Sequence, residues 1–144
     1  LIQSPSPRGN ATLVGSSYTF ESGQSLMLEY LHDGHGYTRA EEAAYFQRAT
    51  TQFGLPLGLM PRLLGRDYCH AVWQANMMSD TGYWRLMYTR NLTDSGNEFA
   101  FYGETTLHPR LSIYALAVLP LGSARQEAGA LFTRSFTLGI KSSI

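Results

Sequence analysis

Apolar and polar residues alternate along most of this chain with a period of two, which is the pattern of β-strands with two different faces. The alternating runs are separated by turn residues and span residues 10–20, 24–32, 68–78, 83–90, 98–107, 111–119 and 136–144. Their lengths, 8 to 11 residues, are close to the roughly 9–11 residues of a tilted strand that crosses a bilayer. The pattern therefore predicts an all-β chain of about seven antiparallel strands.

One segment between the second and third runs has a helical signature instead. Thr38 and Glu41 form a T-x-x-E capping box, which predicts a helix from about Arg39 to Phe53. Gly54 then supplies a C-terminal stop. We interpret residues 33–67 as a helical insertion in an extracellular loop.

The connections between the runs alternate in length. The short ones are residues 21–23, 79–82 and 108–110, and the longer ones are residues 32–67, 91–97 and 120–131. Within the last of these, residues 120–130 are predicted to be a polar loop. Short turns at one end and long loops at the other are typical of an outer-membrane barrel, whose short turns are periplasmic.

The chain resembles the C-terminal part of a Gram-negative outer-membrane β-barrel of the porin-like kind. The likeness lies in a strand that enters a Gly-Tyr loop (residues 25–37), a hairpin (residues 90–96) and a final strand of alternating apolar residues. Such a final strand is similar to the assembly signal of these barrels, although that signal usually ends in Phe or Trp and this chain ends in Ile144. The resemblance implies a transmembrane antiparallel β-barrel in the cell outer membrane. Residues 1–144 are expected to be the C-terminal portion of that single barrel domain.

Composition agrees with a surface that is not fully solvated. Charged residues make up 15% of the chain, against roughly 25% in a typical soluble domain, while aromatic residues reach 12%. Several aromatic residues fall near predicted strand ends, where interfacial girdles need them. They are Tyr18, Phe20, Tyr30, Tyr68, Tyr83, Trp84, Phe99 and Phe101. A soluble antiparallel β-rich binding domain alternates in the same way and is the alternative fold.

Polar side chains on the face expected to point inward are candidates for the lining of a lumen. They are Glu29, Gln74, Asn76, Arg85, Glu104 and Lys141. These residues fit either a selectivity lining or a structural network across the lumen, and both interpretations stay open.

The function predicted from this pattern is passive passage of a solute, or a barrel that acts as a sheath for an export or transfer complex. The alternative is an outer-membrane scaffold whose loops bind a partner, with Tyr45, Phe46 and Phe53 as contact residues. Three roles stay open for the helix that carries them: a partial plug of the mouth, a contact surface for a partner, or a rigid cap that only shields the loop.

The expected partners are outer-membrane lipid, the remaining barrel strands and a surface or periplasmic protein. No signal peptide precedes the first run, although an outer-membrane protein must be exported through one. The chain is therefore expected to be a fragment or a mature piece, with the remaining strands supplied by upstream sequence or by another chain. A net charge of zero argues against nucleic acid as a partner.

Catalysis has little support in the sequence, and we predict no enzyme and no cofactor. Some outer-membrane barrels are lipid hydrolases with Ser and His side chains on their wall. In this chain the only such combination of a base and a nucleophile is His70 with Ser79 or Ser112. No G-x-S-x-G elbow, phosphate-binding Gly-rich loop or H-E-x-x-H sequence is present.

A surface metal site is a second chemical candidate. His32 and His35 precede Glu41 and Glu42, and imidazole and carboxylate groups are suitable ligands. Loop polarity alone explains these residues, so we predict no metal.

Overall fold

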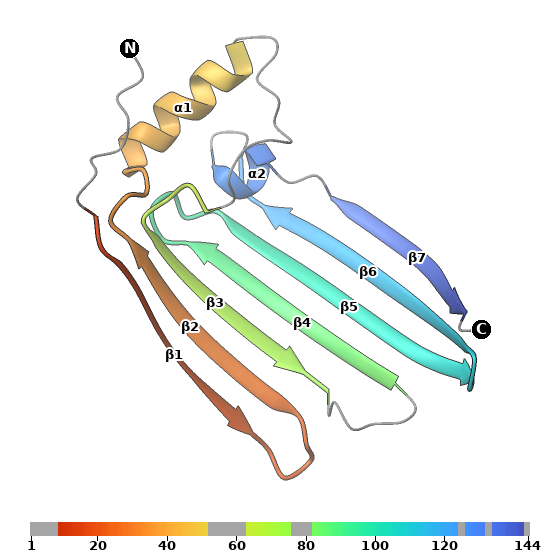
Figure 1. Cartoon of the computed structure of the whole chain (residues 1–144). Coiled ribbons are helices and arrows are strands. Elements are labelled where there is room, and N and C mark those ends of the chain that lie inside the picture. Colours follow the sequence, from red (N-terminus) through yellow and green to blue (C-terminus); the bar gives the residue numbers. More distant parts are fainter. Residues whose placement is uncertain (1–8, 52–62, 76–81, 124–125, 132–133, 143–144) are drawn as a thin grey trace.

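The chain folds into one seven-stranded antiparallel sheet in which each strand pairs with its neighbours in sequence (Figure 1). The computed structural model describes residues 9–51, 63–75, 82–123, 126–131 and 134–142. The strands are β1 (Ala11–Thr19), β2 (Ser25–Asp33), β3 (Asp67–Gln74), β4 (Gly82–Asn91), β5 (Asn97–His108), β6 (Leu111–Leu121) and β7 (Ser135–Ser142). The predicted all-β, antiparallel architecture is confirmed.

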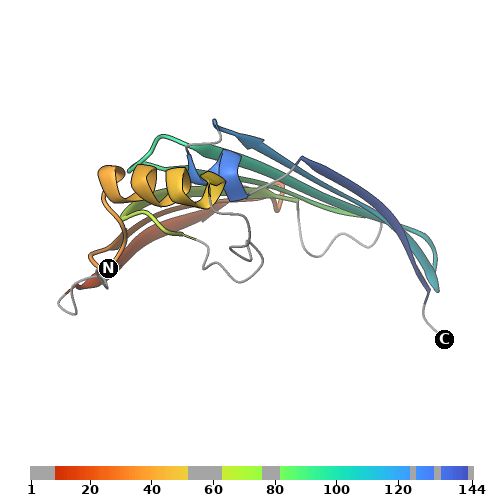
Figure 2. The same ribbon diagram turned by 90° about the horizontal axis from the view of Figure 1, so that it is seen from above.

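The sheet is curved rather than flat. Figure 2 shows it as an arc, with β1 and β7 at the two ends of the arc. Within the described residues these two strands pair on one side only, and they run in the same direction (Figure 1). The sheet is therefore open at both edges.

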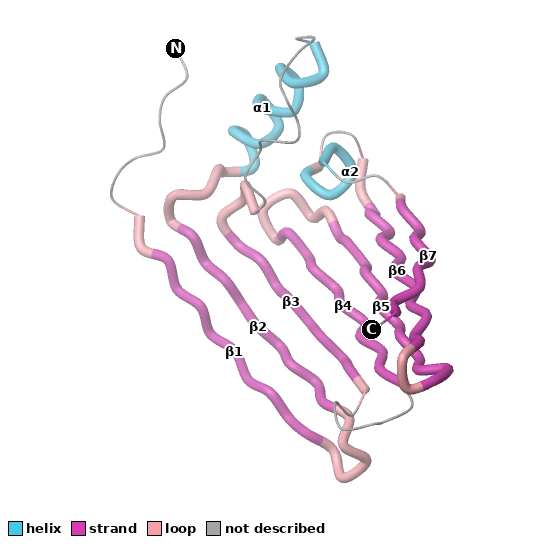
Figure 3. The backbone as a smooth tube through the Cα atoms, turned by 45° about the vertical axis from the view of Figure 1, so that its right-hand side comes forward, coloured by secondary structure: helices cyan, strands magenta, loops and turns pink. Residues whose placement is uncertain are grey.

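Two helices lie at the end of the sheet where β2, β4 and β6 finish, as two views agree (Figures 1 and 3). Helix α1 (Arg39–Thr51) follows β2, and α2 (Glu127–Leu131) follows β6. The capping box that predicts the start of α1 is formed, because the Glu41 carboxylate accepts hydrogen bonds from Thr38 N and Thr38 Oγ1, both at 2.8 Å. None of the described helices is long and apolar enough to cross a membrane.

Helix α2 differs from the polar loop predicted for residues 120–130. It has only five residues, too few for a periodic signal, and its first amide is held by a distant side chain. Glu127 N donates to Asp94 Oδ2 at 2.5 Å, which supplies an N-terminal partner from the β4–β5 connection. This helix therefore forms because of a contact with a residue distant in sequence, and not because of a local sequence signal.

The cross-strand register is almost continuous and sorts the side chains onto two faces. Glu29 lies opposite His70, and His70 lies opposite Thr89, so these three residues share one face. Their neighbours Leu28 and Ala71 pair on the other face. The register shifts only between Thr106 and His108.

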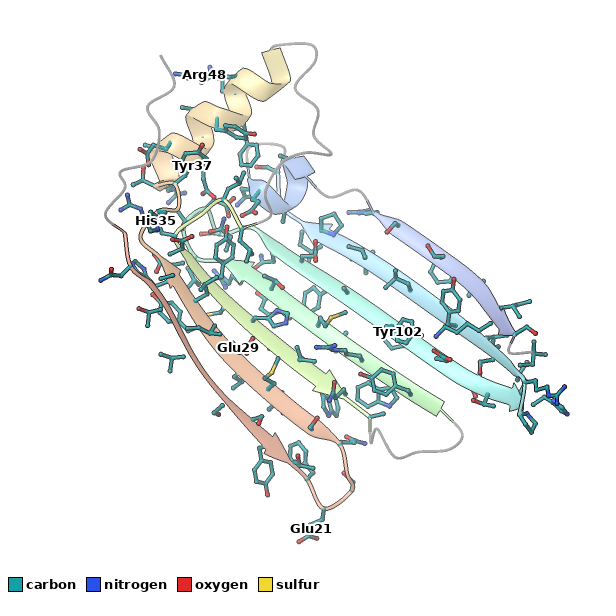
Figure 4. All side chains as sticks on the ribbon, viewed as in Figure 1. Glu21, Glu29, His35, Tyr37, Arg48 and Tyr102 are labelled. Atoms are coloured by element: carbon teal, nitrogen blue, oxygen red, sulfur yellow. The ribbon has the colours of Figure 1, made fainter. Side chains whose placement is uncertain are left out.

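The face that contains Glu29 is the concave face, and Figure 4 labels Glu29 and Tyr102 on it. Leu63 and α2 line a cavity together with side chains of this face. The opposite, convex face carries most of the large exposed apolar side chains.

Little apolar surface is buried. The buried hydrophobic residues are Phe46, Leu64, Tyr68, Val72, Ala75, Ala100 and Ala128. All but Ala75, which follows β3 at the end of the sheet away from the helices, lie on the concave face or near the helices.

A close approach between β6 and β7 requires glycine at position 139. Tyr114 lies opposite Gly139, and a Cβ added to Gly139 would lie 2.2 Å from Tyr114 Cζ. The tyrosine ring therefore lies against the bare backbone of β7, which fixes its position on the concave face.

We expect Gly139→Ala to destabilise the protein by about 1–3 kcal/mol, because the added methyl group overpacks against the Tyr114 ring. The measurement is equilibrium unfolding by a chemical denaturant, with Tyr114→Ala as the second mutation of a double-mutant cycle. In the Tyr114→Ala background, Gly139→Ala should be neutral or slightly stabilising. Equal destabilisation in both backgrounds would show that the ring is not the cause.

Candidate functional site

The convex face is a continuous surface of exposed apolar side chains. On β7, Leu138 is 70% exposed and Ile140 is 72% exposed. In the cross-strand register, Ile140 of β7 lies opposite Ile113 of β6. Phe136 of β7 lies opposite Ala117 of β6, which in turn lies opposite Phe101 of β5. Exposed apolar residues of this face on the other strands include Val14, Tyr18, Leu28, Tyr30, Trp73, Leu86 and Leu119. This apolar band extends over all seven strands.

At the end near the helices, aromatic and polar side chains bound the apolar band. Tyr30 OH donates to Asp67 Oδ1 at 2.6 Å, and Tyr88 OH donates to Asn97 Oδ1 at 2.7 Å. His32 also contacts Asp67, with 2.7 Å between Nδ1 and Oδ1. The rings thus lie against the apolar band while their hydroxyl groups point to polar residues at the strand ends.

The opposite end of the band also has aromatic residues. Trp73 and Trp84 pack edge to face with 5.1 Å between ring centroids. The Trp73 Nε1 group donates to Gln24 Oε1 at 3.2 Å, in the β1–β2 turn. Both ends of the convex face therefore combine an apolar ring with a polar handle.

The concave face has a different chemistry. Five of the six residues proposed from the sequence to line a lumen lie on it. They are Glu29, Gln74, Arg85, Glu104 and Lys141. Asn76 lies outside the described residues.

Two of these five residues form an ion pair across β6. Lys141 Nζ lies 2.5 Å from Glu104 Oε2 and 3.0 Å from Tyr102 OH. The same Nζ lies 5.5 Å from the centroid of the Tyr114 ring, and Tyr102 OH also donates to Glu104. Here the polar residues form a network between β5, β6 and β7.

The remaining candidates are more separate. Gln74 accepts a hydrogen bond from Tyr83 OH at 3.1 Å. Arg85 Nε is buried without a hydrogen-bond partner among the described residues. Glu29 lies on β2 and is not brought near Glu104 or Lys141 by the register.

An apolar row, which the sequence did not predict, crosses the concave face between the polar residues. The register aligns Met27, Val72, Met87, Ala100 and Val118 on five neighbouring strands. Val72 is only 2% exposed. The concave face is therefore polar at two levels with an apolar row between them.

A buried polar cluster attaches the helices to the sheet. Its members are Glu42, Tyr68, Asn91, Asp94 and Glu127, and we call it the anchor cluster. Four of the five are the buried polar residues of the described structure, and Tyr68 is 4% exposed. Each helix contributes one carboxylate, while β3, β4 and the β4–β5 connection supply the rest.

Asn91 is the central donor of the anchor cluster. Its Nδ2 lies 2.9 Å from Glu42 Oε1 in α1 and 2.9 Å from Glu127 Oε2 in α2. Its Oδ1 accepts the Thr93 amide at 2.8 Å. One amide side chain at the end of β4 therefore holds both helices.

Glu127 and Asp94 complete the connections. Glu127 Oε1 accepts the amides of Leu63 at 2.8 Å and Leu64 at 3.1 Å, and Tyr68 OH donates to its other oxygen. Asp94 Oδ1 accepts the Gly96 amide at 2.6 Å. These bonds satisfy carboxylates that burial alone would destabilise.

Glu42 is the least satisfied acid of the cluster. Its Oε2 is buried without a hydrogen-bond partner among the described residues. Burial, together with the nearby carboxylates of Asp94 and Glu127, raises the pKa of Glu42 to about 7, and the hydrogen bond from Asn91 opposes that shift. Glu42 therefore stays protonated up to about pH 7, well above the range in which an ordinary glutamate ionises.

Sequence reasoning did not assign the anchor cluster. The sequence places Asn91 and Asp94 only within the hairpin of residues 90–96, and it suggests only a potential metal ligand for Glu42. The run of turn-forming residues after β4 is the one local signal, because Asn and Asp there bond to nearby amides.

The predicted contact residues of the helix differ in their exposure. Phe46 is buried, with 1% exposure, so its side chain is not presented to a partner. Tyr45 is half-buried and stacks on Tyr37 with 5.8 Å between ring centroids. Phe53 lies outside the described residues.

The potential metal ligands are engaged separately. His32 pairs with Asp67, and His35 pairs with Asp33 at 3.2 Å. Glu41 caps α1. Within the described residues, no group of three or more His, Cys, Asp or Glu side chains is arranged to hold a metal ion.

The proposed catalytic pair is not brought together in the register. His70 Nδ1 of β3 lies 2.9 Å from Thr89 Oγ1 of β4. Ser112 is on β6, where it lies opposite Lys141 of β7. Ser79 lies outside the described residues.

Comparison with known proteins found no matching family model, no matching curated protein and no matching solved structure. Function is therefore inferred from the chemistry of the two faces and of the anchor cluster.

We expect α1 to become easier to open as the pH rises from about 4.5 through about 7. The pKa of Glu42 is raised in the folded state, so its stabilising contribution is complete below the unfolded value of 4.5 and is lost as the pH rises through about 7. Amide hydrogen exchange of α1, corrected for the intrinsic rate, measures the opening free energy between pH 5 and 8.

Glu42→Gln should remove most of this dependence, since the amide does not ionise. Glu41→Gln is the matched control: Glu41 is exposed, and the pKa of its carboxyl is lowered by hydrogen bonds from Thr38. Its variant should therefore keep the slope above pH 5. An unchanged slope in Glu42→Gln would refute the assignment.

Proposed function

We propose that this chain forms part of the wall of a porin-like transmembrane β-barrel in a Gram-negative outer membrane, where it lets solutes pass without catalysis. The observation that carries the proposal is the apolar band of the convex face, opposite a concave face with polar residues. A barrel in a membrane needs this division, with apolar residues outward and polar residues inward.

The energetics of the two faces favour lipid over water. Apolar surface exposed to water costs about 25 cal/mol per Å² relative to an apolar environment. Side chains such as Phe136, Leu138 and Ile140 are each more than two-thirds exposed. Contact with acyl chains removes that cost without any further protein layer.

The dimensions and ends of the strands also support the proposal. The strands have 8 to 12 residues, close to the roughly 9–11 residues that a tilted membrane strand needs. Tyr30, Tyr88, Trp73 and Trp84 lie at the two limits of the band, as expected for interfacial girdles. We assign the end with α1 and α2 to the outside, because extracellular loops are the longer ones in such barrels.

The open edges add a requirement. Unpaired backbone groups at the edge of a sheet are costly in lipid, so a membrane barrel must be closed. Under this proposal the free edges of β1 and β7 pair with further strands, from the same polypeptide or from another one.

Conductance across a planar lipid bilayer tests the proposed passage of solutes. The complete protein should produce discrete current steps that scale with salt concentration. A barrel that acts only as a scaffold with a filled lumen would insert without current steps, and that result would contradict the pore.

We expect Leu138→Arg to impair membrane assembly and Thr137→Arg to be tolerated. Both side chains are exposed on β7, but Leu138 is in the apolar band and Thr137 is on the concave face. An arginine that faces lipid near the bilayer midplane costs about 2–4 kcal/mol, whereas one that faces a lumen does not.

The measurement is the heat-modifiable fraction after refolding into lipid vesicles, with each variant at matched concentration. In a soluble sheet both arginines would be solvated equally. Equal assembly of the two variants would therefore count against the membrane proposal.

A further inference from the structure

A cavity of about 360 Å³ lies on the concave face next to α2. Its apolar lining includes Leu13 of β1 and Leu31 of β2. Leu63, which precedes β3, and Ala128 of α2 complete this apolar lining. Its polar lining includes Glu29 and His70, which are cross-strand neighbours on β2 and β3. The volume lies within the range of about 300–1,000 Å³ that is usual for small-molecule sites.

The charges of the lining are predominantly acidic. Three carboxylates line the cavity, from Glu29, Glu98 and Glu127, and His70 is the only basic side chain among the lining residues. No Lys or Arg is among them. The cavity therefore favours a positively charged ligand over a neutral or negative one.

Glu29 is the acid best placed to meet a ligand. Glu127 already accepts the amides of Leu63 and Leu64 and the Asn91 side chain. His70 is directed at Thr89, with 2.9 Å between Nδ1 and Oγ1. No hydrogen bond to Glu29 is found within the part of the chain that the structure describes.

The backbone of β1 makes room for the Glu29 side chain. Gly15 lies opposite Glu29, and a Cβ at position 15 would lie 2.9 Å from Glu29 Cγ. The glutamate chain therefore rests against bare backbone at one edge of the cavity, which limits its rotamers.

We propose that this cavity binds a small organic cation with an apolar body. The ammonium group pairs with the Glu29 carboxylate, and the apolar body packs on Leu13, Leu31 and Leu63. This goes beyond the proposed function, because it concerns a bound ligand and not a passing solute. Since Tyr68, Asn91 and Glu127 also line the cavity, an occupant contacts the anchor cluster and stabilises the attachment of the helices.

A series of three probes that differ in charge tests the proposal. They are 2-phenylethylammonium, the neutral 2-phenylethanol and the anionic phenylacetate, titrated by calorimetry into the complete protein in an uncharged detergent at pH 7.5. The ammonium probe should bind, the alcohol should bind at least tenfold more weakly, and phenylacetate should not bind. Equal binding of ammonium and alcohol, or no binding of the ammonium probe, would overturn the proposal.

Variants locate the site. Glu29→Gln should weaken the ammonium probe at least tenfold with little effect on the alcohol, and Glu29→Asp should retain part of the affinity. Glu104→Gln removes an acid from the same face outside the cavity and should leave binding unchanged. Leu31→Trp fills the cavity and should abolish binding.

Each variant is first checked for the native far-UV circular dichroism spectrum, so that loss of binding is not confused with loss of the fold. Native affinity in folded Glu29→Gln would refute the assignment. Because binding is measured in detergent and passage in a bilayer, either proposal can fail while the other holds.

Discussion

The continuous antiparallel pairing of the seven strands is the constraint on which the other features depend. Side chains alternate between faces along a strand, so a slip of one residue between two strands would exchange their faces. Leu28 lies opposite Ala71, and Glu29 lies opposite His70. The two apolar residues therefore share one face of the sheet, and the two polar ones share the other. The register also sets the position of Tyr114 against Gly139 and brings Lys141 of β7 within reach of Glu104 of β5.

Buried polar contacts attach both helices to the sheet. Asn91 donates to one carboxylate from each helix, and these carboxylates lie in buried surroundings. A buried acid is stable only when hydrogen bonds or protonation compensate for lost hydration. Glu127 is compensated by backbone amides, whereas Glu42 is compensated in part by its raised pKa. The attachment of α1 therefore depends on pH through Glu42, whereas α2 is held by hydrogen bonds from backbone amides to Glu127.

The strands could be predicted because each one carries its own alternating signal. β2 was expected at residues 24–32 and spans Ser25–Asp33, and β4 was expected at 83–90 and spans Gly82–Asn91. The orientation of β6 could not be predicted, because both of its faces are largely apolar. Only pairing with β5, which sets Tyr114 opposite Glu104, assigns its faces.

The parts of the candidate site that were missed depend on long-range contacts. Asn91 is 49 residues from Glu42 and 36 residues from Glu127, so no local pattern connects them. The apolar row that includes Val72 and Met87 is visible only after five strands are aligned. By contrast, the concave position of Arg85 and Lys141 follows from simple alternation, and for that reason the sequence could place them.

If the sheet is part of a closed barrel, as proposed above, the common direction of β1 and β7 limits the strands that can complete it. If every new pair is antiparallel, the added strands must begin and end in the opposite direction, and only an odd number of strands satisfies both edges. A second copy of the chain with the same orientation in the membrane would place β7 beside a parallel β1, which creates two parallel seams. An even total is the rule in bacterial single-chain outer-membrane barrels. In the proposed barrel, the missing strands must therefore be odd in number, and the first and last of them must run opposite to β1 and β7.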